Sequence, residues 1–267
     1  MTNSSSEITI IQRSIIAEMR QQLLFILAEA DNLKRGESLS AEGFSRLQII
    51  RSTILSILKH SSLIENTVNN KGLLVKRETF NLCEFLEDLA NGINNMIGGH
   101  NGVNVKFSPY KEKNVSIYTA SLEFEYILCS LISLIMRNFS DDGKKQVKIS
   151  MGRGKDEKSF IITLSADGFP MPRLYAMLLG SEMFLPDMPD FEEMNIYVIN
   201  MNLKMLSGNV EYKRTKTKNK FTIELPSEIP VNIGSAETRA REQVKKLIDK
   251  ELIYIQFSEF TKDKKDS

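Results

Sequence analysis

Apolar residues recur at intervals of three and four over most of the first seventy positions, and this spacing limits the fold more than any other feature. One apolar stripe runs through residues 7–34, and a second runs from about residue 40 to residue 69. Intervals of three and four place side chains on one face of a helix. Each segment is therefore predicted to form a long amphipathic helix.

The two helices are predicted to be joined by a tight turn. Gly36 lies where a helix C-cap is expected, and Ser40 lies where its side chain can cap the next helix. Two long helices with so short a connection form an antiparallel hairpin. One hairpin leaves part of its apolar surface uncovered, because each helix has a single neighbour. Residues 7–70 are therefore interpreted as a homodimerisation domain that forms a four-helix bundle with a second copy.

The pattern changes at about residue 78. A helix is expected over 80–97, followed by strands over 103–107 and 115–118, which are predicted to neighbour each other. An apolar helix is expected from 122 to about 139, and strands over 146–151 and 159–164. After an irregular stretch over 168–189, a helix is expected over 191–206 and a hairpin of 209–214 with 220–225. Strands with helices on one face make an α/β sandwich, so the fold class is α+β and the second domain spans 78–226. Residues 227–267 form a tail with helical spacing over 236–254. Whether this tail covers the domain or docks elsewhere stays open.

Composition sets limits on the partners. Hydrophobic residues make up 42% of the chain, charged residues 26%, and the formal net charge is +1, so no charge excess over the whole chain favours nucleic acid or a membrane surface. The most apolar window, 126–136, is about half the length that crosses a bilayer, and the N-terminus lacks a signal-peptide pattern. We therefore expect a cytoplasmic protein. Two histidines and two cysteines without a cluster predict no metal site.

Several segments carry a family resemblance. Residues 80–86 read FNLCEFL, 122–137 form the apolar helix, 165–172 read SADGFPMP, 205–210 read MLSGNV, and 221–226 read FTIELP. In order and spacing they are similar to the domain-opening motif, the N-box helix, the D-x-G-x-G turn, the last helix and the closing strand of sensor histidine kinases. The chain thus resembles, over about residues 10–226, a histidine-kinase core: a dimerisation and phosphotransfer hairpin followed by a GHKL-type ATP-binding domain.

The resemblance also shows what has been replaced in the hairpin. The family's phosphoacceptor histidine corresponds to Ala17, and the proline that follows it corresponds to Gln22. A methyl group can neither attack a phosphoryl group nor carry one. Without the proline, the first helix is expected to run straight.

The nucleotide-binding positions are replaced as well. Ser130 and Leu134 stand for the two N-box asparagines, Ala166 for the adenine-binding aspartate, and Glu193 and Asn195 for the glycines that approach phosphate. Leucine offers Mg²⁺ no ligand, and a carboxylate at Glu193 repels an anion. We therefore expect no cofactor, no bound metal and no kinase activity.

What the resemblance then implies is a non-catalytic, histidine-kinase-like regulator of two-component or phosphorelay signalling. In the family, the hairpin binds receiver domains of response regulators. The corresponding surface here consists of Glu18, Gln21, Leu24 and Phe25 facing Arg51 and Ile54. The expected partners are a second copy and either a receiver domain or a true histidine kinase.

Two alternatives stay open. A hairpin folded about residues 37–38 brings His60 within one turn of the position of Ala17, so a phosphorelay phosphotransferase could use His60 as a relocated acceptor. A residual nucleotide-binding switch could use Asp167 and Asn138 in place of the lost ligands.

Overall fold

A computed structural model describes the backbone of residues 2–36, 39–69, 76–98, 102–108, 110–111, 115–140, 145–155, 158–181, 190–215, 217–227 and 248–260. Within the first two helices, the side chains of residues 2–13, 34–36, 63 and 65–69 lie outside this description. The chain divides into two compact units, residues 1–73 and 74–267. Each unit is described by itself below.

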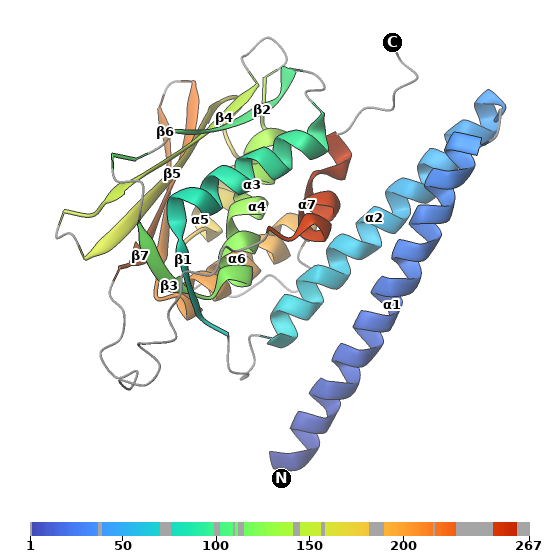
Figure 1. Cartoon of the computed structure of the whole chain (residues 1–267), viewed down its shortest axis with the longest axis horizontal. Helices are drawn as coiled ribbons and strands as arrows, with labels where there is room; N and C mark the ends of the chain where they lie inside the picture. Colours follow the sequence, from blue (N-terminus) through green and yellow to red (C-terminus); the bar gives the residue numbers. More distant parts are fainter. Residues whose placement is uncertain are drawn as a thin grey trace. The chain divides into compact units, whose positions relative to one another are not determined.

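The first unit is a hairpin of two helices, α1 (Thr2–Gly36) and α2 (Ala41–Asn69), which run antiparallel (Figure 1). Both long helices are thereby confirmed. Ser40 caps α2 as predicted, because its Oγ accepts a hydrogen bond from the Gly43 backbone N–H at 3.1 Å. Helix α1 continues without a break through Gln22, consistent with the missing proline.

The interior of the hairpin combines apolar side chains with one ion pair. Leu27 and Ala30 of α1 and Ile54 of α2 are buried. Nε of Arg51 donates to Oδ1 of Asp31 at 3.2 Å and joins the two helices near the turn.

The second unit contains a five-stranded sheet in the order β2-β4-β5-β7-β6. Its strands are β2 (Asn104–Ser108), β4 (Gln146–Arg153), β5 (Ser159–Asp167), β6 (Asn209–Thr215) and β7 (Lys218–Pro226). Strand β2 is parallel to β4, and the other pairs are antiparallel. Helices α3 (Leu82–Ile97), α4 (Ser121–Arg137) and α6 (Phe191–Met205) cover one face of the sheet (Figure 1). The expected α/β sandwich is thus present.

The pairing predicted between segments 103–107 and 115–118 is wrong. The second segment forms β3 (Ser116–Thr119), which pairs with the short strand β1 (Glu78–Asn81) in a separate two-stranded sheet. Phe80 and Ile117 lie opposite each other there, and both are buried. The helix expected from Phe80 therefore begins only at Leu82, after Asn81, whose Oδ1 accepts from the N–H groups of Cys83 and Glu84.

The tail ends in a short helix, α7 (Lys250–Phe257), and a 3₁₀ turn, η2 (Ser258–Phe260), which pack against α3 and α4. Part of the predicted tail helix, residues 236–247, lies outside the described residues. Gly92 of α3 permits the close approach, since a Cβ there would lie 2.8 Å from Cδ1 of Ile253. The tail therefore covers its own domain. Among the described residues, none of the helices has the length and apolar composition to cross a bilayer.

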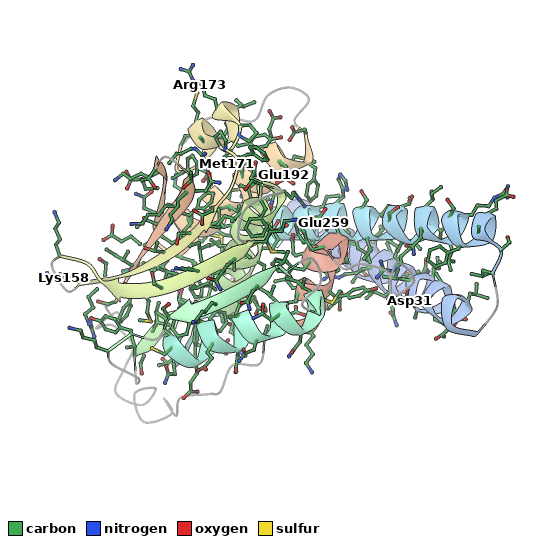
Figure 2. The ribbon with its side chains drawn as sticks, turned by 90° about the horizontal axis from the view of Figure 1, so that it is seen from above. Asp31, Lys158, Met171, Arg173, Glu192 and Glu259 are labelled. Carbon is green, nitrogen blue, oxygen red and sulfur yellow. The ribbon has the colours of Figure 1, made fainter. Side chains whose placement is uncertain are left out.

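Between β5 and α6 the chain forms a further short helix, α5 (Arg173–Leu178). It lies in the stretch predicted to be irregular. In Figure 2, Arg173 points away from the rest of the unit, whereas Met171, just before the helix, points inward and is buried.

Candidate functional site

The first turn of α6 stands where the resemblance places the phosphate-binding glycines, and a reciprocal capping box occupies it. Oδ1 of Asp190 accepts from the Glu193 backbone N–H at 2.8 Å, and Oε2 of Glu193 accepts from the Asp190 N–H at 2.8 Å. The unpaired N–H groups of a helix start are the donors that bind phosphate. Here the carboxylates of the chain itself take two of these donors.

The electrostatics of this helix start are also unsuited to an anion. Asp190, Glu192 and Glu193 bring three carboxylates together, and Arg137 of α4 forms an ion pair with Glu192. Partial burial, followed by the hydrogen bond and charge of Asp190 and the charge of Glu193, raises the pKa of Tyr175 to about 12, while Arg137 lowers it. The charges around the start of α6 therefore favour the protonated form of Tyr175 and disfavour a bound anion.

Asn195, at the position of the second glycine, is held by a neighbouring helix. It is 2% exposed, and its Oδ1 accepts from the Tyr126 hydroxyl of α4 at 2.9 Å. Burial raises the pKa of Tyr126, so the phenol stays protonated and remains a donor. The amide fills space that backbone needs in order to approach a phosphate.

The N-box positions are part of the core. Ser130 and Leu134 of α4 are 0% and 2% exposed. Asn138, the alternative ligand one turn further on, folds back and donates from Nδ2 to the Leu134 carbonyl at 2.7 Å, while its own carbonyl accepts from the Phe169 N–H at 2.7 Å. Asn138 thus ends α4 and anchors the loop that follows β5.

Ala166 and Asp167 lie on opposite faces of the sheet, because side chains alternate along a strand. Ala166 is buried under the helices, whereas Asp167 lines a small pocket on the other face with Gln146, Lys148 and Lys218. An adenine bound between the helices and the sheet cannot reach Asp167. The described residues therefore do not fit ATP–Mg²⁺, and no group of three or more metal-binding side chains occurs among them.

The hairpin presents the other predicted site. Ala17, Glu18, Gln21 and Phe25 are exposed on α1, and Phe25 has 67% of its surface accessible. Leu24 is half-buried. Of the other two residues predicted for this surface, Arg51 pairs with Asp31 between the helices and Ile54 is buried. The exposed members of the predicted surface therefore lie on α1.

His60 of α2 is exposed, and its Nδ1 lies 2.7 Å from the Ser56 carbonyl oxygen. A carbonyl only accepts, so Nδ1 carries the proton of this bond. In the neutral ring the lone pair then lies on Nε2.

Sequence reasoning did not single out three residues that shape this candidate site, namely Tyr126, Arg137 and Asp190. A signal existed for Asp190, because Asp190-Phe-Glu-Glu193 has the spacing of a capping box. Nothing local in the sequence indicates that Tyr126 meets Asn195, which is 69 positions away.

The comparisons with known proteins agree with this architecture. No protein-family profile matches the chain, and no curated protein matches its sequence. Its structure is similar to Acinetobacter baumannii histidine kinase AdeS, at 15% identity and a TM-score of 0.50, over 78% of this chain and 97% of that one. It is also similar to full-length ShkA, solved in complex with AMPPNP, at 15% identity and a TM-score of 0.56, over 80% of this chain and 45% of that one. The chain therefore has the fold of a sensor histidine-kinase core.

Proposed function

We propose that this protein is a non-catalytic, cytoplasmic regulator of two-component or phosphorelay signalling, which acts by docking a protein partner on its helical hairpin. The observation that carries the proposal is the capping box of Asp190 and Glu193, which closes the helix start where a kinase of this fold would hold phosphate. Ala17 removes the acceptor in the hairpin. A histidine-kinase fold that neither binds phosphate at α6 nor carries a phosphoacceptor still presents the surface of its hairpin to a protein partner.

Dimerisation is part of the proposal, and the exposed apolar residues of the hairpin support it. Ile50, Ile57 and Ile64 of α2 are exposed and seven residues apart, as are Met19, Ile26 and Leu33 of α1. A seven-residue interval is the spacing of a seam between packed helices. These stripes differ from the residues that already join α1 to α2. A second hairpin would cover them and complete a four-helix bundle.

The face proposed for the partner is separate from this seam. Glu18, Gln21 and Phe25 follow one another at intervals of three and four, so they share one face of α1. Phe25 is adjacent in sequence to the seam residue Ile26, and a helix turns about 100° per residue. Phe25 thus stays accessible beside the seam, where a large exposed aromatic ring is a typical hot spot for binding.

Purified receiver domains and histidine kinases from the same cell test the proposal by direct binding. At least one is expected to bind the full chain, and Phe25→Ala is expected to weaken binding by at least about 2 kcal/mol, or roughly thirtyfold. The matched control is Leu122→Ala on α4, which truncates another exposed apolar side chain, 56% accessible. The proposal is wrong if no receiver or kinase binds, or if both variants weaken binding equally.

A second candidate function is phosphotransfer through His60, favoured by its exposure and by the Nδ1 hydrogen bond to Ser56. This bond orients the ring and leaves the Nε2 lone pair as the nucleophile. Incubation with a phosphorylated receiver distinguishes this function from docking alone. Phosphate on the wild-type chain that is absent from His60→Ala would replace the docking proposal with this one.

A residual nucleotide switch receives no support from Asn138 or Asp167. The first is bonded to its own helix, and the second lies on the far face of the sheet. Calorimetric titration with ATP–Mg²⁺ is therefore expected to give no binding heat. A saturable signal that Ala166→Asp strengthens would show that a nucleotide still enters between the helices and the sheet.

A further inference from the structure

The sheet face opposite the helices carries a row of lysines that none of the functions above uses. Strand pairing places Lys106 of β2 beside Lys148 of β4, Lys148 beside Ser165 of β5, Ser165 beside Lys220 of β7, and Lys220 beside Lys213 of β6. All four lysines are exposed. We call Lys106, Lys148, Lys213 and Lys220 the lysine row. It crosses all five strands, which at a strand spacing of ~4.8 Å is about 19 Å.

The row concentrates charge in a chain that is close to neutral. Two of its pairs, Lys106 with Lys148 and Lys213 with Lys220, are directly opposite each other on neighbouring strands. Like charges in that relation destabilise a sheet. Within the described part of the chain, Lys213 alone among the four has a carboxylate at ion-pair distance, Glu211 at 2.8 Å. An arrangement that costs stability and is left largely uncompensated points to an external negative partner.

The surroundings of the row leave its ammonium groups projecting. Most neighbours on the same face are short and uncharged: Ser108, Ser150, Thr163, Ser165 and Thr222, with Asn104 and Gln146 at one end. Three carboxylates, Asp167, Glu211 and Glu224, also lie on this face toward β5, β6 and β7, so the uncompensated charge is greatest at Lys106 and Lys148. Lys218, two residues before Lys220 on the same face of β7, adds a further exposed cation opposite Asp167. Long lysine side chains above short hydroxyl side chains can all reach one external surface.

The residue types on this face indicate which class of anionic partner, nucleic acid or lipid, fits it better. Every cation named is a lysine, whereas recognition of individual phosphates in nucleic acid favours the bidentate guanidinium of arginine. No aromatic side chain belongs to these positions, so bases have nothing on which to stack. This face consists of strands and has no helix that could enter a groove. A diffuse array of point charges suits a fluid surface of anionic lipid headgroups, which needs no fixed spacing.

We propose that the lysine row binds the surface of an anionic lipid bilayer and holds the protein there by charge alone. The proposal is independent of the hairpin and of the signalling role. The face offers no apolar group large enough to insert beyond the half-buried Ile161. Binding is therefore reversible and weakens steeply as ionic strength rises.

Sedimentation of the full chain with vesicles tests the proposal. Vesicles of phosphatidylcholine with about 30% phosphatidylglycerol are expected to bind the chain, and vesicles of phosphatidylcholine alone are not. The double variant Lys148→Gln/Lys220→Gln is expected to bind about thirtyfold more weakly, because each lysine near such a surface contributes roughly a factor of five. The matched control is Lys111→Gln/Lys155→Gln, which removes two exposed lysines outside this face.

The vesicle assay, together with a measurement of binding to duplex DNA, can overturn the proposal. Equal binding to both kinds of vesicle, or none to either, would exclude an electrostatic lipid site. An equal loss of binding in the control variant would assign any attraction to net charge. Tighter binding to duplex DNA at the same salt concentration, lost in Lys148→Gln/Lys220→Gln, would make nucleic acid the partner instead.

Discussion

The hydroxyl of Tyr126 donates to Oδ1 of Asn195 across 2.9 Å and joins α4 to α6 inside the second unit. Both residues are 2% exposed, so neither can exchange this bond for water. The resemblance assigns the position of Asn195 to a glycine beside bound phosphate. In this chain the same position helps to hold two helices together. The hydrogen bond thus makes this part of α4 and α6 belong to the structural core of the second unit.

Tyr126→Phe is expected to lower the free energy of unfolding by about 1–3 kcal/mol, because it leaves a buried amide oxygen of Asn195 without its donor. Urea unfolding followed by circular dichroism measures the change. Tyr197→Phe is the matched control, since Tyr197 lies on the same helix as Asn195 and no hydrogen bond of its hydroxyl occurs among the described residues. Equal losses in the two variants would show that the effect does not come from the hydrogen bond between Tyr126 and Asn195.

Tyr175 predicts a dependence of stability on alkaline pH. Its pKa is raised to about 12 by partial burial and by Asp190, whereas an unfolded tyrosine titrates near 10. A raised pKa means that the folded chain holds the proton more tightly. This contribution is therefore complete below about pH 10 and is lost as the pH rises to about 12. In thermal unfolding, the melting temperature of the wild type should fall over this pH range more than the melting temperature of Tyr175→Phe. Identical pH profiles for the two proteins would contradict the prediction.

Local patterns in the sequence were sufficient for most of the elements. The stripes of α1 and α2, the cap at Ser40 and the hairpin of β6 with β7 depend on residues close in sequence, so periodicity and capping chemistry predict them. The pairing of β1 with β3 was missed. Strand β1 has four residues, too few for an alternating pattern, and its partner is decided by burial of Phe80 against Ile117.

The candidate site could be interpreted from the sequence only by comparison with the family's motifs. That comparison assigns Ala17, Leu134, Ala166 and Glu193 to positions where the family has other residues, but it does not show what these four side chains contact. Glu193 was expected only to repel an anion, whereas it also caps α6. The partners of a buried polar group depend on which distant segments meet, and periodicity carries no information about that.

Gly168 marks a close contact between two loops, and its replacement tests how tightly they pack. A Cβ at this position would overlap the carbonyl oxygen of Asn138, a backbone atom that cannot move aside easily. Gly168→Ala is expected to lower the free energy of unfolding by about 1–3 kcal/mol. Gly152→Ala on β4 is the control, since no atom lies within 4 Å of its added Cβ. Urea denaturation measures the free energy of unfolding of both variants. If Gly168→Ala is as stable as Gly152→Ala, Gly168 does not pack tightly against the Asn138 carbonyl.

Glu125 predicts how the tail is held. This carboxylate of α4 is fully buried, and its Oε1 accepts from the Asp249 N–H at 2.8 Å, at the start of α7. It thus acts on α7 as the glutamate of a capping box does, but from another helix. After α7, Nη2 of Arg137 lies 2.7 Å from Glu259 (both Glu192 and Glu259 are labelled in Figure 2).

Glu125→Ala removes the acceptor of the Asp249 N–H, so hydrogen exchange over residues 250–257 should rise about tenfold or more. Glu123→Ala, on the same helix but half-buried, should leave that exchange unchanged. Exchange that rises equally across α4, α6 and α7 would instead mean that the whole domain has been destabilised, and that Glu125 does not hold the tail specifically.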